Sequence, residues 1–211
     1  MNRQLRREYN GEPLLESKVD PDPIRQLQRW LQEANEAKVV EPEAMCLATV
    51  DEQGRPDARF VLLRGLDERG LVFYTSANSP KGRQLMANPC AAVVFWWGEL
   101  ARQVRVQGMV KPVSEAEADA YFATRPRGHQ LAAWASPQSE VIPNRQVLEE
   151  RMAELERQYE GRPVPRPPYW IGFRIVPHTF EFWQGRPNRL HDRLRYTRQP
   201  DGSWKIERLA P

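Results

Sequence analysis

Short apolar runs separated by turn residues dominate the chain between residues 44 and 110. Polar, glycine-containing turns at residues 52–55 and 67–70 divide these runs. Runs of this length between such turns are typical of strands, and their close spacing favours antiparallel hairpins. Within residues 101–110 polar and apolar side chains alternate, so one face of that strand is polar and the other apolar. We therefore predict strands at residues 44–50, 58–64, 71–75, 91–97 and 101–110.

Helical patterns occupy the segments before and between these strands. Apolar residues recur at helical spacing from Ile24 to Ala34, behind an Asp22-Pro23 start, which predicts a helix to about residue 38. Ser79-Pro80 opens a short helix that ends near residue 88. Ser114 and Glu117 have the spacing of a capping box and open a helix that ends at residue 125. A further helix is predicted at residues 144–160, and closing strands at residues 170–183 and 193–209.

The element pattern predicts a mainly β fold with helices. Many short strands with a few helices between them favour a barrel of antiparallel strands decorated by about four to five helices. A chain of 211 residues is long enough for one well-buried domain, which we place at residues 21–211. Residues 1–20 are polar and charged, and we expect a flexible N-terminal arm that a partner or ligand orders.

Composition excludes several classes of partner. The net charge of +3 is only mildly basic and the chain has no Lys/Arg tail, so nucleic acid is a weak candidate. The sequence has no apolar run that could span a membrane and no apparent signal peptide, which favours the cytoplasm. Cys46 and Cys90 lie in apolar runs, as buried free thiols of a reducing compartment do. Three histidines without a Cys/His cluster argue against a zinc site.

The stretch Glu181–Arg193 is the strongest candidate for a site. Phe182 and Trp183 lead into a Gly-Arg-Pro-Asn turn, after which Arg189, His191 and Arg193 occupy every second position. In an extended strand these three side chains share one face, which suits an anion beside a flat ring. A strand with a solvated polar face is the alternative interpretation.

Other candidate groups also suit anions. Ser79-Pro80-Lys81 starts a helix, where free N–H groups bind phosphate, although an ordinary cap has the same pattern. Tyr121 and Arg125 are four apart and share a helix face, which is equally typical of a solvated surface. Arg59 and Arg64 flank an apolar run and, five apart on a strand, are expected on opposite faces unless a bulge intervenes.

The remaining candidates are individually weak, and no catalytic signature accompanies them. His129 suits a ligand, a surface group or a capped core histidine; Gln103 is an ordinary polar strand residue; Trp183 is most often a core residue. The chain has no GxGxxG, GxxxxGK[ST] or GxSxG motif and no evident pair of acidic residues for acid–base catalysis. A chain rich in anion-binding groups that lacks its own nucleophile predicts chemistry borrowed from a phosphorylated cofactor.

Over almost its whole length the sequence resembles the pyridoxamine 5′-phosphate oxidase family. The most specific segment is Glu-Phe-Trp-Gln-Gly followed by Arg-Leu-His-Asp-Arg, within Glu181–Arg193. Further matching segments are Arg59–Leu63, Val72–Thr75, Arg102–Val104, Tyr121-Phe122 with Arg125–Arg127, and Gln138-Ser139. The resemblance implies an FMN-binding split β-barrel, assembled as a homodimer with two FMN molecules at the subunit interface.

The resemblance also implies roles for individual residues. For FMN it implies contacts with Arg59, Arg64, Tyr74, Thr75, Lys81, Gln103, Gln138, Ser139, Trp183 and Arg193. For the substrate phosphate it implies Arg64, Tyr121 and Arg125, with Arg189 and His191 over the pyridine ring as the catalytic pair. The segment from Arg6 to Tyr9 is expected to act as a lid that contacts the substrate.

The implied reaction belongs to vitamin B6 metabolism. The C4′ carbon of pyridoxamine or pyridoxine 5′-phosphate gives a hydride equivalent to FMN, and O2 reoxidises the flavin to yield hydrogen peroxide. The product is pyridoxal 5′-phosphate, with ammonia released from the amine. The protein groups orient the ring and stabilise charge.

Three residues depart from the family pattern. Arg64 stands where Lys is usual, His129 where Ser is usual in the phosphate grip, and Pro80 where Arg is usual. Our hypothesis is that a partly protonated His129 takes over part of the phosphate grip. The departures leave two rivals open: a phenazine-type FMN oxidase of the same fold, and a non-enzymatic carrier of flavin or pyridoxal phosphate. A nucleic-acid-binding barrel is a third, weaker alternative.

Overall fold

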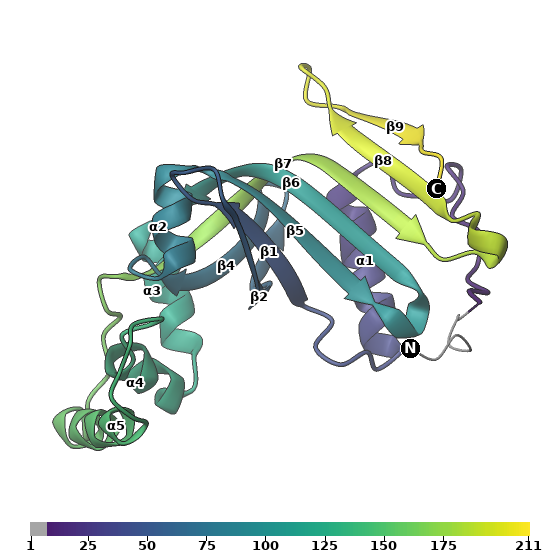
Figure 1. Cartoon of the computed structure of the whole chain (residues 1–211). Helices are drawn as coiled ribbons and strands as arrows, with labels where there is room; N and C mark the ends of the chain where they lie inside the picture. Colours follow the sequence, from purple (N-terminus) through teal and green to yellow (C-terminus); the bar gives the residue numbers. More distant parts are fainter. Residues whose placement is uncertain (1–7) are drawn as a thin grey trace.

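A single antiparallel sheet of nine strands organises the protein, seen in a computed structural model that describes residues 8–211. Helices α3, α4 and α5 gather at one end of the sheet, and the β8–β9 hairpin lies at the other (Figure 1). The strands are β1 Ala44–Val50, β2 Pro56–Leu62, β3 Gly65–Asp67, β4 Gly70–Ser76, β5 Cys90–Trp97, β6 Arg102–Pro112, β7 Trp170–Gln184, β8 Asp192–Arg198 and β9 Trp204–Arg208.

Strand β7 is the longest strand, and it pairs with three others, β6, β4 and β8. The main path runs β2-β1-β5-β6-β7-β4-β3, with β8 and β9 added beside β7. One edge of β7 pairs with β6 along most of its length, with a register shift at Gln107/Gly108. Its other edge is divided, since residues 170–175 pair with β4 and residues 179–184 pair with β8. The prediction of a mainly antiparallel β fold is therefore confirmed.

Five α-helices accompany the sheet in the described residues, within the predicted range. They are α1 Pro23–Glu36, α2 Pro80–Ala87, α3 Glu115–Thr124, α4 Arg127–Ala135 and α5 Gln146–Gln158, with short 3₁₀ turns η1 Gly98–Leu100 and η2 Pro187–Arg189. Helix α4 was not predicted from the sequence. It starts after Pro126 without a side-chain cap, so it lacks the start signal on which the other predictions relied.

The predicted helix caps are present, with one difference. Asp22 Oδ1 accepts a hydrogen bond from the Ile24 amide at 2.9 Å, and Ser114 Oγ accepts from the Glu117 amide at 3.1 Å. The Glu117 carboxylate binds the Arg174 guanidinium at 2.6 Å. A capping glutamate would return to the start of its helix, so Glu117 serves to fasten α3 to the sheet.

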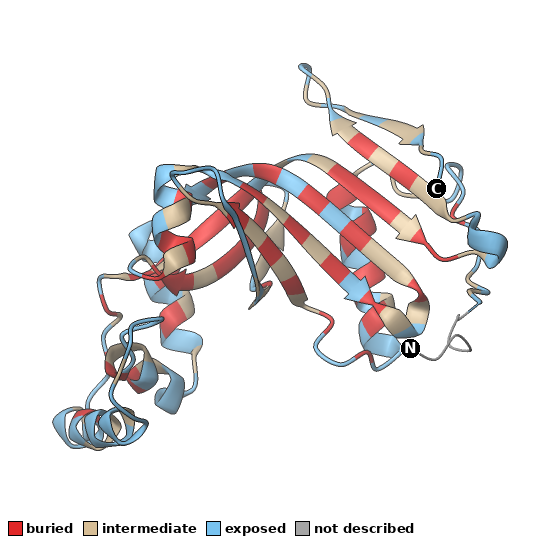
Figure 2. Ribbon diagram, viewed as in Figure 1, coloured by how far each residue is buried: buried red, intermediate tan, exposed pale blue. Residues whose placement is uncertain are grey.

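Two apolar clusters form the interior. The larger fills the concave side of the sheet beneath α1, where the Trp30 ring meets Phe182 at 5.2 Å and Trp97 at 6.4 Å. The smaller joins the helical end to the sheet around Phe122, Leu131, Leu155 and Trp170. Buried and exposed positions alternate along the strands (Figure 2), as a sheet with one covered face requires.

The described part of the N-terminal segment lies against the C-terminal strands. Leu14 is buried in the larger cluster, and its amide donates to Asp192 Oδ2 at 3.1 Å. Arg208 binds the Glu16 carboxylate and the Leu14 carbonyl. The lid role expected for this arm stays a prediction.

Two expectations from composition can be compared with the described residues. Both cysteines are free, but Cys90 is exposed and Cys46 half-buried, so the prediction that they are buried was wrong. None of the helices combines the length and apolar character that crossing a bilayer requires.

Candidate functional site

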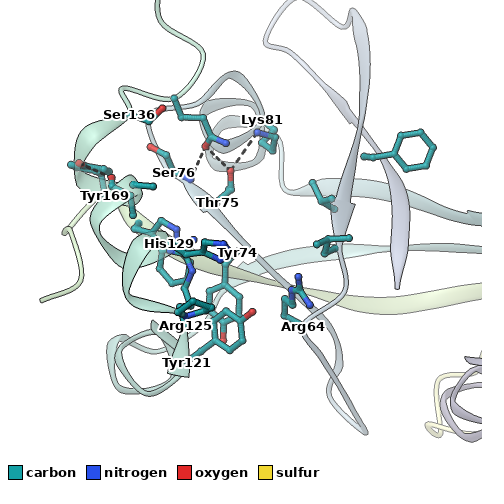
Figure 3. A pocket seen from close by; sticks show the side chains of 18 of the residues that line it. Arg64, Tyr74, Thr75, Ser76, Lys81, Tyr121, Arg125, His129, Ser136 and Tyr169 are labelled. Atoms are coloured by element: carbon teal, nitrogen blue, oxygen red, sulfur yellow. Dashed lines mark hydrogen bonds between the residues drawn. The ribbon is translucent and has the colours of Figure 1, made fainter. Parts of the chain in front are cut away.

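A cavity of about 750 Å³ lies where the sheet meets α2, α3 and α4. Its cationic lining residues are Arg59, Lys81, Arg64 and Arg125, and none of the lining residues in the described part of the chain carries a carboxylate. Tyr74, Tyr121, His129 and Gln138 complete much of its polar wall. Figure 3 shows Thr75, Ser76 and Lys81 at one end and Arg64, Tyr121 and Arg125 at the other. Arg59 pairs with Asp57, but Lys81, Arg64 and Arg125 have no carboxylate partner in residues 8–211. Unpaired cations beside neutral donors predict anionic ligands.

The first end of the cavity is built by β4 and the start of α2. The Lys81 ammonium is buried and donates to Thr75 Oγ1 at 3.4 Å. Burial, and then the charge of the nearby Arg59, lowers the pKa of Lys81. Gln138 Oε1 accepts from Thr75 Oγ1 and from the Ser76 amide, both at 3.1 Å. A cation destabilised by burial and a like charge gains most from a bound anion.

The second end of the cavity combines aromatic rings with two further arginines. The Tyr74 and Tyr121 rings stack with centroids 4.1 Å apart and an interplanar angle of 9°. The Arg125 guanidinium lies 4.7 Å from the centre of the Trp170 ring. Burial, and to a lesser degree the Arg64 charge, lowers the pKa of Arg125. Arg125 Nη1 is buried without a hydrogen-bond partner in residues 8–211, so it is available to an anion.

Arg59 and Arg64 both line this cavity, and the expectation that they face opposite sides was wrong. Strand β2 ends at Leu62, so the strict alternation of a strand does not extend to Arg64. Arg64 lies in the connection to β3, where its amide donates to the Val72 carbonyl at 2.8 Å. Arg59 stays in the strand, paired with Asp57 and hydrogen-bonded to Thr49 Oγ1 at 2.5 Å.

A separate aromatic group forms at the far end of β7. The Trp183 and His191 rings lie 4.6 Å apart, and the Tyr9 ring meets each of them edge-on at 5.7 Å. Gln103 stands opposite Trp183 in the β6–β7 register. This group therefore brings together residues from the N-terminal arm, β6, β7 and the turn before β8.

The prediction that Arg189, His191 and Arg193 share a strand face was wrong. Only Arg193 lies in a strand, because Pro187–Arg189 forms a 3₁₀ turn in which Asn188 and Arg189 have φ of 56° and 62°. Such left-handed residues reverse the chain, so alternate positions no longer point the same way. Arg193 instead binds the buried Glu181 carboxylate at 3.0 and 3.1 Å.

The neighbours of His191 determine its tautomer and lower its pKa. The Arg186 amide donates to His191 Nδ1 at 3.1 Å, so this nitrogen is an acceptor and a proton on the neutral ring belongs on Nε2. Burial, followed by the charge of Arg189, lowers the pKa of His191 below its ordinary value of 6.5. The imidazole is therefore a hydrogen-bond donor through Nε2 at neutral pH.

The remaining candidate residues lie in neither the cavity wall nor the aromatic group. Ser139 is exposed, with φ of 70°, next to Gln138 but not in the cavity wall. Arg6 falls outside the described residues. The cavity also includes Trp170 and Tyr169, which were not predicted as site residues. They follow a proline-rich loop, and no local pattern indicates that this loop returns to α3.

The two groups are far apart within one chain. Trp170 borders the cavity and Trp183 belongs to the aromatic group, and both lie on β7. At about 3.3 Å per residue, the strand between them is about 40 Å long, and Figure 1 places its two ends on opposite sides of the molecule. One small ligand cannot contact both groups of the same chain.

Comparison with known proteins places this architecture in a family. Residues 31–159 match the family described as pyridoxamine 5′-phosphate oxidase. Residues 170–211 match the pyridoxine 5′-phosphate oxidase C-terminal dimerisation region. The chain belongs to the pyridoxamine 5′-phosphate oxidase family.

Members of the pyridoxamine 5′-phosphate oxidase family resemble the chain throughout. It is 60% identical over 207 residues to pyridoxine/pyridoxamine 5′-phosphate oxidase from Rubrobacter xylanophilus, covering 98% of this chain and 95% of that one. It is 56% identical over 207 residues to the protein of the same name from Microcystis aeruginosa, covering 98% and 97%. These relatives carry the name of an oxidase, and the chain is accordingly an oxidoreductase of this family.

Solved structures share the fold. PhzG from Burkholderia lata, in complex with tetrahydrophenazine-1-carboxylic acid, superposes with a TM-score of 0.89 at 35% identity, covering 95% of this chain and 99% of that one. A pyridoxamine 5′-phosphate oxidase-related, FMN binding protein from Nostoc punctiforme superposes with a TM-score of 0.73 at 21% identity, covering 92% and 100%. The second likeness supports the fold alone.

The form of His191 can be tested by titration. We expect its imidazole to titrate below 6.5 and to carry its neutral proton on Nε2, because Nδ1 accepts the Arg186 amide. Arg189→Leu removes a repelling charge and should raise the pKa of His191. ¹⁵N NMR of the imidazole across pH measures both, with Arg198→Leu, an exposed change on β8, as the control. A proton on Nδ1, or no response to Arg189→Leu, would contradict this assignment.

Proposed function

We propose that the protein oxidises pyridoxamine 5′-phosphate and pyridoxine 5′-phosphate to pyridoxal 5′-phosphate, using FMN and O2. Hydrogen peroxide is released, with ammonia from the amine, in vitamin B6 salvage in the cytoplasm. The observation that carries the proposal is the cavity, which residues 8–211 line with two pairs of cations and no carboxylate. Two cation pairs suit two phosphate groups, one from the cofactor and one from the substrate.

The residues at the Lys81 end fit the phosphate of FMN. Lys81 makes no ion pair in residues 8–211, although its side chain is buried, and Thr75, Ser76 and Gln138 present polar groups beside it. We assign the FMN phosphate to Arg59, Lys81 and these neighbours, with Arg64, Tyr74 and Ser139 also at the cofactor. When bound, FMN supplies the two-electron acceptor that the chain itself lacks, and O2 receives the electrons.

The residues at the other end fit the phosphate of the substrate. Arg64 and Arg125 carry planar guanidinium groups that bind phosphate in a bidentate manner. Neither makes an ion pair with a carboxylate among the described residues, and the Arg125 Nη1 donor is buried and free. Tyr121 adds a phenol, and His129 adds an imidazole from α4. This group orients the substrate by its phosphate, away from the reacting carbon.

We propose that a second copy of the chain completes each site. Trp183, Arg189, His191 and Arg193, with Gln103, lie too far from the cavity of their own chain to reach its ligands. The match of residues 170–211 to a dimerisation region supports a homodimer with FMN at the interface. In the sheet register, Cys46 of β1 lies between Phe60 of β2 and Val94 of β5. Phe60 is 73% exposed, so these three strands offer an apolar face to the second copy.

The partner groups would act on the substrate ring. A neutral His191 with its proton on Nε2 donates a hydrogen bond, and Arg189 places a positive charge beside it. Both would bind the polar substituents of the pyridine ring and hold C4′ in position to give up its hydride equivalent. Tyr9 stands against Trp183 and His191, and we propose that the arm covers the ring and excludes water.

The overall proposal is tested by adding each B6 phosphate to FMN-loaded protein in air. We expect hydrogen peroxide and pyridoxal 5′-phosphate in equal amounts, and ammonia from the amine only. Unphosphorylated pyridoxine is the control, since it lacks the group that Arg64 and Arg125 bind. Flavin binding without peroxide would move the substrate to the phenazine type, as for PhzG, or indicate a carrier. Failure to bind FMN would overturn the cofactor assignment.

Shared sites predict complementation between two inactive variants. One carries Arg125→Leu in the cavity, and the other carries Arg189→Ala with His191→Ala. In a mixed dimer one of the two sites has neither defect, so an equal statistical mixture should regain about one quarter of wild-type activity. Co-refolding followed by the peroxide assay measures this. Activity no higher than that of the parents would place each site within a single chain.

His129 is predicted to bind the substrate phosphate. His129→Ala should raise the KM for pyridoxine 5′-phosphate about threefold to tenfold and leave kcat nearly unchanged, because one hydrogen bond to a charged group is lost. His178→Ala, an exposed change on β7 outside the cavity wall, is the matched control. Steady-state kinetics decide the point, and an unchanged KM for His129→Ala would remove this residue from the site.

A further inference from the structure

Trp170 occupies the joint between the sheet and the helical end. It is the first residue of β7, it is 8% exposed, and it belongs to both the smaller apolar cluster and the cavity wall. We propose that Trp170 is a positioning residue for the phosphate of the substrate: its indole fixes the Arg125 guanidinium directly and the Tyr121 phenol through Tyr74. The identity of the anion rests on the proposed function, whereas the positioning contacts rest on geometry alone.

The contact with Arg125 is the first step of the argument. The Arg125 guanidinium lies 4.7 Å from the centre of the Trp170 ring and 5.5 Å from that of Phe122. Arg125 has no carboxylate partner in residues 8–211, and its Nη1 is buried without a hydrogen bond. Ring faces attract a guanidinium without occupying its N–H donors. Trp170 therefore holds the cation in place and leaves its donors for a ligand.

The second step is the stack of three nearly parallel rings. Tyr74 lies 4.1 Å from Tyr121 and 5.0 Å from Trp170, with interplanar angles of 9° and 5°. Tyr121 and Trp170 are 6.1 Å apart at 7°. Burial, and then the charge of Glu117, raises the pKa of Tyr74 to about 12, so its phenol stays protonated at neutral pH. The orientation of the Tyr121 ring thus follows from that of Trp170.

The third step is the attachment of α3, which carries Tyr121 and ends directly before Arg125. Arg166 donates to the Trp170 carbonyl at 2.7 Å and to Asp119 of α3 at 2.6 Å. Arg174 binds Glu117 of α3 at 2.6 Å and Asp67 at 2.7 Å. Two arginines therefore hold the helix to the sheet without the indole. Loss of the Trp170 ring should loosen the two side chains while α3 stays in place.

A purely structural role for Trp170 makes a different prediction. If the indole only fills the smaller apolar cluster, its loss should resemble the loss of Trp134, which packs on the same cluster and donates to the Pro165 carbonyl at 2.7 Å. Trp134 does not line the cavity and has no cation over its ring in the described residues. Trp134→Leu is therefore the matched control for Trp170→Leu.

The test measures anion binding separately from oxidation. In FMN-saturated protein, inorganic phosphate is titrated and followed by ³¹P NMR, and KM and kcat are measured with pyridoxine 5′-phosphate. We expect Trp170→Leu to weaken phosphate binding and raise KM about tenfold, the scale of a desolvated cation–π contact, with kcat nearly unchanged. Trp170→Phe keeps a ring and most of the packing, so its affinity for phosphate should fall only about threefold. Trp134→Leu should behave as wild type.

Several outcomes would overturn the inference. One is wild-type affinity for phosphate in both Trp170→Phe and Trp170→Leu. Another is a loss of phosphate affinity in Trp134→Leu equal to that in Trp170→Leu. A third is a Trp170 variant that binds FMN more weakly but phosphate as well as the wild type does. If Trp170→Leu does not fold, Trp170→Phe still decides the matter. If the wild-type protein binds phosphate, the Trp170 variants bind it more weakly, and neither B6 phosphate is oxidised, the proposed function is refuted and the positioning role stands.

Discussion

The site depends on one continuous strand, β7, which is paired along both edges. Its first residues pair with β4 and border the cation-lined cavity, and its last residues pair with β8 and carry the aromatic group. Since one edge is paired with β6 throughout most of its length, neither end moves independently of the sheet. The distance between the two groups is thereby fixed at a length that no single ligand spans. In the site that we propose, the second group therefore has to come from another chain.

Charge pairing distinguishes the structural arginines from those of the cavity. Arg174, Arg193 and Arg208 each bind carboxylates, and these contacts fasten α3, β8 and the N-terminal segment to the sheet. Arg64, Arg125 and Lys81 have no carboxylate partner within residues 8–211, and burial lowers the pKa of the latter two. Holding such cations together lowers the free energy of unfolding. A bound anion raises it again, because a ligand that binds only the folded state stabilises that state by mass action. Ligand binding and stability should therefore be linked in this protein.

Local patterns in the sequence were sufficient for most strands and helices, although they missed β3 and the turn between β8 and β9. They were insufficient for the geometry of the site. Apolar runs between turn residues predicted β1 and β5 closely, and alternation predicted β6. Asp22, Ser79 and Ser114 marked three helix starts. The assumption of a regular strand failed at Arg64 and at Arg189–His191, where the chain leaves the strand and local spacing no longer fixes direction. Trp170 was missed because its importance comes from contacts with α3 and β4, which no local pattern encodes. The family resemblance named Arg64, Arg189 and His191 as site residues, but it did not name Trp170.

The two groups also differ in how firmly they are held. The cation-lined cavity lies on β4, α2 and α3 and is fixed by stacked rings and by the buried Arg174, which binds Glu117. Arg189 and His191, in contrast, lie at a turn with consecutive left-handed residues. A rigid anion site is suited to recognition, since its donors are positioned before the ligand arrives. A turn held by the Arg186–His191 hydrogen bond permits small adjustments over a reacting ring. In the homodimer that we propose, these functions belong to different chains, so assembly of the dimer and assembly of the active site would be a single event.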